Sequence, residues 1–196
     1  MPTCKPLAAS CCHRDRKLIF NFSVKVPRTI THYKKLVNCE IELSDFYALI
    51  RNGLKDKIAC ILFQFPPSFS YTADRLKSII QNVDRSSNNI VEFRHESWWQ
   101  QGVYQQLHEN NITFCNISHP KLPDEFIGTS PIFYLRLHGV PELYKSSYSK
   151  EYLDNIVSFI NENKKINTAY VYFNNTMNAS ALENANYIKE LISSFK

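Results

Sequence analysis

Six short apolar runs recur along the chain, and most of the segments between them have helical periodicity. The runs cover residues 18–26, 58–65, 89–94, 112–117, 132–138 and 168–174. Their length and their β-branched and aromatic content predict strands, and a strand that regularly alternates with a helix predicts parallel strands joined by crossovers. The pattern therefore indicates an α/β fold built from repeated β/α units.

The connecting segments carry recognisable helix signals. Residues 44–57 place Phe46, Leu49, Ile50 and Leu54 at helical spacing, and residues 72–83 follow a capping Thr72. We expect further helices that begin at Ser97 and that cover 149–163 and 178–195. Prolines and a glycine interrupt residues 118–131, so an irregular loop is expected there.

Several of the predicted strands end in polar side chains. In a parallel β/α barrel the strand ends converge on one rim, so residues far apart in sequence are expected to share one site. The candidate ligand-binding residues are Lys25, Arg28, His32, Gln64, Arg94, Arg136, Asn174 and Asn175, and the candidate catalytic residues are Glu92, His95 and His138.

Five motifs appear in order along the chain: Lys25-Val26-Pro27-Arg28, Phe63-Gln64-Phe65-Pro66-Pro67, Glu92-Phe93-Arg94-His95-Glu96, Tyr134-Leu135-Arg136-Leu137-His138-Gly139 and Tyr172-Phe173-Asn174-Asn175. Over residues 18 to 195 the chain resembles the DUF72 (YecE-like) family. The resemblance implies a TIM-barrel-like fold of uncharacterised activity, so it supplies an architecture and a candidate rim but no reaction.

The number of strands is lower than this fold requires. A closed β/α barrel has eight strands, whereas about six are visible, so we predict an incomplete TIM-barrel-like parallel β/α barrel over residues 18–196. Residues 1–17 form an irregular segment that is too short to supply a β/α unit. We expect a chain truncated relative to its family, in which exposed sheet edges favour self-association. A fragment or a divergent gene product explains the pattern equally well.

Glu92, Arg94 and His95 form the sharpest candidate cluster. Side chains alternate along a strand, so Glu92 and Arg94 point to one face and His95 lies at the following turn. The group is consistent with proton transfer by Glu92 and His95, with ligand binding, or with a structural Glu–Arg pair. Arg136 and His138 repeat the two-residue spacing, and Arg136 suits either an anionic ligand or a structural ion pair. Asn174 and Asn175 fit amide contacts to a ligand or a capping role.

Charge balance favours an anionic small molecule or a phosphate ester as the ligand. The net charge is +5, and Glu92 is the one clear acid among the predicted rim residues. The excess is scattered, so nucleic acid is a weaker candidate partner. No metal site is predicted, because neither the cysteines nor the Glu92, His95 and His138 set has a recognised ligand spacing, and no cofactor is identified. The main alternative to an enzyme-derived binding barrel is a non-catalytic interaction protein or an inactive truncated remnant.

The cysteine content and the hydropathy of the chain indicate its cellular compartment. The chain has six cysteines but no signal peptide and no repeated metal-ligand spacing, which is typical of a reduced cytoplasmic protein. No apolar stretch approaches the roughly 20 residues that span a bilayer. A cytoplasmic protein without a membrane partner is therefore expected.

Overall fold

The computed structural model describes residues 20–194, and the predicted N-terminal segment 1–17 lies outside that range. The chain divides into two compact units, whose described parts are residues 20–114 and 115–194. We call them the N-terminal unit and the C-terminal unit.

Six parallel strands, in the part of the chain that the structure describes, form the sheet in the order of the sequence. They are β1 (Phe22–Lys25), β2 (Ile58–Gln64), β3 (Asn89–Glu92), β4 (Ile112–Ser118), β5 (Ile132–Leu137) and β6 (Thr168–Phe173). Each strand is parallel to its neighbour, and β4 begins in the N-terminal unit and ends in the C-terminal unit. Sequential parallel strands with helical crossovers are the topology of a β/α barrel. The predicted fold class, an incomplete α/β barrel, is confirmed.

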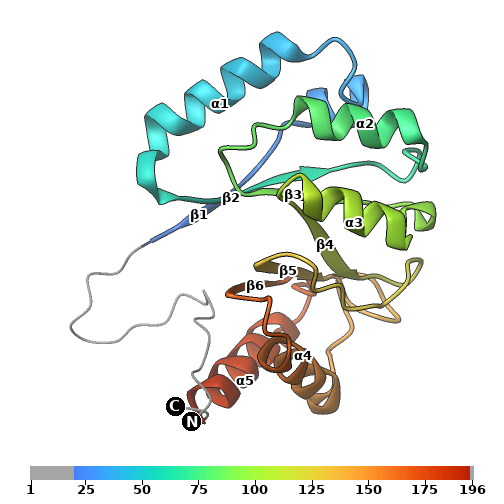
Figure 1. Ribbon diagram of the computed structural model, residues 1–196. Helices are drawn as coiled ribbons and strands as arrows, with labels where there is room; N and C mark the ends of the chain where they lie inside the picture. The colour runs from blue at the N-terminus through green and yellow to red at the C-terminus, as the bar shows by residue number, and fades with distance from the viewer. Residues whose placement is uncertain (1–19, 195–196) are drawn as a thin grey trace. The chain divides into compact units, whose positions relative to one another are not determined.

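Within residues 20–194, an α-helix follows every strand except β4 (Figure 1). The five helices are α1 (Glu40–Leu54), α2 (Ala73–Asn82), α3 (Gln101–Glu109), α4 (Lys150–Glu162) and α5 (Ser180–Ser194). Two starts follow the capping rule, because the Thr72 hydroxyl accepts from Arg75 N and the Ser149 hydroxyl accepts from Tyr152 N. The prediction for 44–57 was wrong at its start. The helix begins four residues earlier at Glu40, and two glutamates in its first turn stabilise this start by their favourable interaction with the helix dipole.

The helix predicted to begin at Ser97 was also wrong at its start. A short 3-10 helix, η3 (Glu96–Trp98), comes first, and the His95 ring accepts a hydrogen bond from Ser97 N at 3.2 Å. The chain then turns at Trp99 before α3 begins at Gln101. The side chain of Trp98 is fully buried, and placing it in the core takes this segment out of α-helical register.

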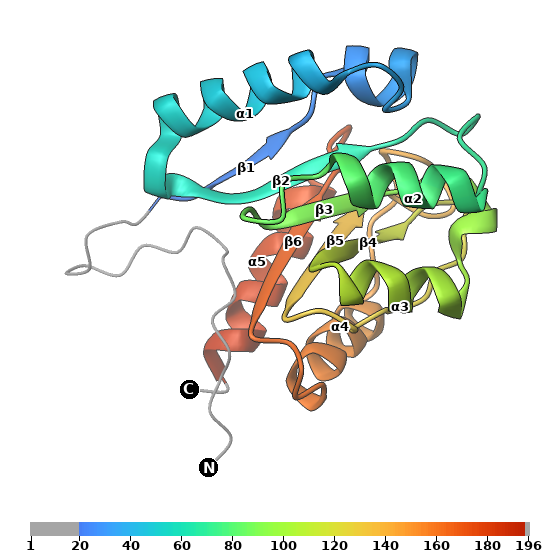
Figure 2. The same cartoon turned by 45° about the horizontal axis from the view of Figure 1, so that its top comes forward.

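Aromatic rings form much of the core of the N-terminal unit. The rings of Phe93 and Trp98 stack 3.9 Å apart at 6°, and Phe65 stacks on Phe69 at 4.4 Å. Trp98 Nε1 donates to Phe69 O at 2.7 Å, so its one polar group is satisfied. Helices α1 and α2 lie on the same side of β1 and β2 (Figure 2), as right-handed crossovers require. This packing fixes the positions where β2 and β3 end.

The core of the C-terminal unit lies between β5 and the helices α4 and α5. Phe133, Leu135 and Leu137 alternate along β5 and pack with apolar residues of α4 and with Ile188 of α5. The intervening residues Tyr134 and Arg136 therefore point to the opposite face of the strand. Residues 119–131 contain no helix or strand, as their prolines predict. Among residues 20–194, every helix is too short or too polar to cross a bilayer.

Candidate functional site

Three predicted site residues are the last residues of neighbouring strands in the N-terminal unit. Lys25 ends β1, Gln64 ends β2 and Glu92 ends β3. Gln64 and Glu92 are register partners, and Lys25 Nζ donates to Gln64 Oε1 at 2.6 Å. The parallel strands thus bring Lys25 and Glu92, which are 67 positions apart in the sequence, to the same end of the sheet. We call this end of the sheet its strand-end edge.

Glu92 and Arg94 form an ion pair at this edge. Arg94 Nε lies 2.5 Å from Glu92 Oε1, as two residues on the same side of an extended chain can. The Glu92 side chain is fully buried and that of Arg94 is 11% exposed. The predicted orientation of the two side chains is therefore correct, and a buried carboxylate has a guanidinium beside it.

Arg28 and His32 follow β1 on a turn of π-helix, η1 (Thr29–Lys34), for which Arg28 is the N-terminal cap residue. Lys35, Leu36 and Asn38, just beyond η1, all have positive φ angles between 48° and 62°. Left-handed non-glycine residues and π-turns are both costly and concentrate at functional sites. The irregular backbone holds His32 half-buried beside the strand ends.

The charged groups around His32 show that positive charge predominates at these strand ends. Burial lowers the pKa of His32 below its usual 6.5, and the positive charges of Arg28, Lys25 and Arg94 lower it further, while Glu92 alone raises it. Three cations from β1, its following turn and the end of β3 therefore outweigh one acid. We call Lys25, Arg28, His32, Gln64, Glu92 and Arg94 the strand-end cluster.

His95 has a local structural role in addition to its place near the cluster. Its Nδ1 lies 2.8 Å from Ser97 Oγ and accepts from Ser97 N, which caps η3. With Nδ1 occupied in this way, a proton-transfer role for His95 would use Nε2. His95 thus lies beside the strand-end cluster in sequence, with its ring oriented by the cap.

The C-terminal unit holds the other predicted site residues in a second group. His138 follows β5 directly and is buried, and its Nδ1 lies 3.4 Å from the side-chain nitrogen of Asn174 at the end of β6. Arg136 is the register partner of Tyr172 and shares the face of β5 that carries Tyr134, whose ring lies 5.0 Å from that of Tyr172. Arg136, His138 and Asn174 therefore belong to one end of the β5–β6 pair.

Asn175 is placed differently from Asn174. It is fully buried, and its Nδ2 donates to Ser146 O at 3.0 Å and to Asn184 Oδ1 at 3.1 Å, whereas its Oδ1 has no hydrogen-bond partner. Asn184 also accepts from Tyr148 N and donates to Tyr148 O. These two amides tie the loop after β5 to α5, which favours the structural alternative for Asn175.

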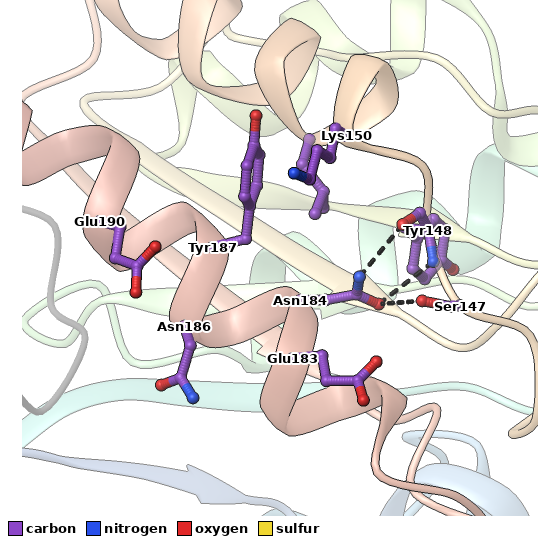
Figure 3. Close-up of a pocket in the computed structure, with 9 residues that line it drawn as sticks. Ser147, Tyr148, Lys150, Glu183, Asn184, Asn186, Tyr187 and Glu190 are labelled. Carbon is purple, nitrogen blue, oxygen red and sulfur yellow. Dashed lines mark hydrogen bonds between the residues drawn. The ribbon is translucent and has the colours of Figure 1, made fainter.

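A groove of about 470 Å³ lies between the start of α4 and α5 (Figure 3). Lys150, Tyr187 and Asn184 contribute to its wall, and the Lys150 ammonium lies 5.3 Å from the centre of the Tyr187 ring. Asn184 is its buried polar side chain, and its hydrogen bonds go to Ser147, Tyr148 and Asn175. None of the predicted site residues lines the groove, but Asn175 is hydrogen-bonded to Asn184 in its wall.

Thr31 contacts His32 but is not among the residues predicted from the sequence to form the site. It is fully buried, its Oγ1 lies 2.9 Å from His32 Nδ1, and it donates to Pro27 O at 3.4 Å. A threonine next to a histidine is too common a pair to have identified it. Within residues 20–194, no three His, Cys, Asp or Glu side chains are grouped as metal ligands.

Comparison with known proteins places this arrangement in a family. The chain is 27% identical to a DUF72 family protein from Thermotoga maritima, with a TM-score of 0.79 over 89% of this chain and 74% of that one. A DUF72 family protein from Enterococcus faecalis V583 matches at 18% identity with a TM-score of 0.76, again over 89% and 74%, which shows the shared fold. No curated protein matches the chain. A family profile described as "Protein of unknown function DUF72" matches residues 14–195, and the chain belongs to this family.

Proposed function

We propose that the strand-end cluster binds an anionic small molecule, with a phosphate ester as the favoured class. One observation carries the proposal: three cations, Arg28, Lys25 and Arg94, act on His32 against the single acid Glu92. Glu92 is already paired with Arg94 at 2.5 Å, so the remaining charge of the cluster is positive. An anion is the ligand that would neutralise it.

The exposure of the cations supports the same proposal. Lys25 and Arg28 are exposed, whereas Glu92 is fully buried. A ligand approaching from solvent therefore meets an ammonium and a guanidinium before the carboxylate. Guanidinium groups bind phosphate and carboxylate oxygens in a bidentate manner, and Gln64 adds an amide beside Lys25.

The test is isothermal titration of inorganic phosphate and of a phosphate monoester into the protein. Arg28→Gln should weaken binding by about tenfold to a hundredfold, the range of one charge-assisted hydrogen bond. Arg85→Gln is the matched control, because it removes the same charge from an exposed residue that precedes β3 and so lies at the opposite strand end. No binding by the wild-type protein, or equal losses in both variants, would overturn the proposal.

The binding residues do not by themselves assign a reaction. Glu92 and His95 remain the proposed proton-transfer groups of an enzyme-derived barrel, and His138 with Arg136 is the corresponding group of the C-terminal unit. Turnover should be sought with phosphate esters. Glu92→Gln and His95→Gln should each abolish it if the group of the N-terminal unit exchanges protons, and His138→Gln should abolish it if the group of the C-terminal unit does. Retained turnover in all three variants would exclude both assignments.

An interaction protein is the second candidate function. Ile41 and Leu49 on α1 are 75% and 72% exposed, and Phe20 and Phe22, just before and at the start of β1, are exposed as well. A second copy is the proposed partner, since isologous dimers bring identical apolar patches together. Light scattering should give a dimer that Leu49→Glu dissociates, and a wild-type monomer at high concentration would exclude this candidate.

We further propose that the protein functions in the cytoplasm. Cys39, Cys60 and Cys115 are buried free thiols, and unpaired cysteines of this kind are typical of a reducing compartment. Fluorescence microscopy of the tagged full chain would test the location.

A further inference from the structure

We propose that His32 makes the strand-end cluster selective for doubly charged anions, because it takes up a proton when a dianion binds. The Thr31 hydroxyl accommodates the new proton by changing from donor to acceptor in its hydrogen bond with His32 Nδ1. This inference rests on the proposed anion-binding function and specifies it. It assigns His32 and Thr31 as specificity-determining residues, and it names dianions such as a phosphate monoester as the ligand class.

The contact between Thr31 and His32 can serve both charge states of the imidazole. Thr31 Oγ1 lies 2.9 Å from His32 Nδ1 and 3.4 Å from Pro27 O. With a neutral ring, the hydroxyl donates to Nδ1, which leaves the ring proton on Nε2. With a protonated ring, Nδ1–H donates to Oγ1 and the hydroxyl donates to Pro27 O instead. A hydroxyl is both donor and acceptor, so one group satisfies both forms.

Burial keeps this exchange local. Thr31 is fully buried, so its hydroxyl is restricted to partners inside the protein, and Pro27 O also accepts from the backbone nitrogens of Ile30 and Thr31. Pro27 O therefore keeps hydrogen bonds in either state of the hydroxyl. The switch needs only a rotation of one hydroxyl and no movement of η1.

Charged groups from each neighbouring element bias His32 toward the neutral form. Lys25 from β1, Arg28 from the turn before η1 and Arg94 from the end of β3 oppose its protonation, and Glu92 from β3 favours it. A bound dianion would offset the three cations and favour protonation, whereas a monoanion would offset them less. By linkage, a ligand that promotes proton uptake must bind more tightly as the pH falls.

Sulfate and nitrate are the probes, because neither anion titrates between pH 5 and 8, so any proton taken up must go to the protein. Sulfate should be titrated calorimetrically at pH 7 in Bis-Tris and in Tris, whose different ionisation heats reveal the number of protons exchanged. We expect uptake of a fraction of one proton with sulfate, little with nitrate, and a sulfate affinity that rises by at most tenfold for each pH unit lowered from 8 to 6.

Three variants separate the roles of the two residues. His32→Gln should abolish proton uptake and leave sulfate binding independent of pH. Thr31→Val, which keeps the side-chain shape, should reduce the uptake, and Thr31→Ser, which keeps the hydroxyl, should preserve it. Circular dichroism confirms that each variant is folded before titration.

The outcomes distinguish this inference from the function on which it rests. Sulfate binding without proton uptake, or uptake that persists in His32→Gln, overturns the role of His32 and leaves anion binding intact. Equal binding of sulfate and nitrate overturns the proposed selectivity. Absence of binding by sulfate and by phosphate overturns both proposals.

Discussion

Arg94 Nε lies 2.5 Å from Glu92 Oε1, and the carboxylate that it contacts is fully buried. Removing one partner of a buried ion pair is more costly than removing both, because the remaining charge is left in a poorly solvated place. Arg94→Met should therefore lower the free energy of unfolding by about 3–5 kcal/mol, measured by chemical denaturation. The double variant Arg94→Met/Glu92→Gln should recover part of that loss, and no recovery would show that the pair is not coupled.

The glycine after β5 should be intolerant of a side chain. Gly139 has a φ of +91°, and a Cβ there would lie 2.8 Å from Glu142 O. Gly139→Ala should cost about 1–3 kcal/mol of folding stability, because the backbone is strained and the neighbouring carbonyl must move. Gly102→Ala is the matched control, since that glycine lies in α3 with open space around it. This substitution should raise the folding stability by about 0.5–1 kcal/mol. Equal effects at the two positions would contradict the assigned backbone constraint.

The amide of Asn184 should be a major stabiliser of the C-terminal unit. It hydrogen-bonds both backbone groups of Tyr148 and the side chain of Asn175. Asn184→Ala would remove these partners of the Tyr148 backbone and one of the two acceptors of Asn175 Nδ2, and we expect a loss of about 2–3 kcal/mol in urea denaturation. Asn186→Ala on the same helix, where the side chain is exposed, should change stability by less than about 0.5 kcal/mol.

Alkaline pH should destabilise the fold through two buried acids. Burial raises the pKa of the Cys60 thiol from 9.0 to about 12 and that of the Tyr47 hydroxyl from 10.0 to about 12. The unfolded chain therefore loses these protons first, so their stabilisation is complete below about pH 9 and is lost as the pH rises toward 12. Denaturation midpoints between pH 8 and 11 measure this slope.

Variants assign the alkaline slope to these groups. Cys60→Ala and Tyr47→Phe should both flatten it, although each variant should be less stable than the wild type near pH 8. For Tyr47→Phe the cause is the loss of hydrogen bonds to Asn89 Oδ1 and from Asp84 N. An unchanged slope in both variants would mean that other groups control the alkaline transition.

Alternation along strands made the fold and part of the site predictable. A period of two placed Glu92 and Arg94 together, and parallel strand ends placed Lys25 near Gln64. The π-turn that carries His32 was not predictable, because the positive φ angles after it fall on Lys35, Leu36 and Asn38 rather than on glycine. The His95 cap was missed for a similar reason, since histidine is an uncommon capping residue and Ser97 has the ordinary capping signature.

Strand β2 is buried from Ala59 to Phe63, and polarity enters only at Gln64, its last residue. Exchange of such a terminal side chain alters the chemistry of the rim without disturbing the methyl and aromatic groups that hold the sheet together. Natural drift can therefore act on recognition and on architecture as nearly independent traits. Relatives that share this scaffold can acquire different ligands through the substitution of a few residues at strand ends. Their common fold therefore does not require a common substrate.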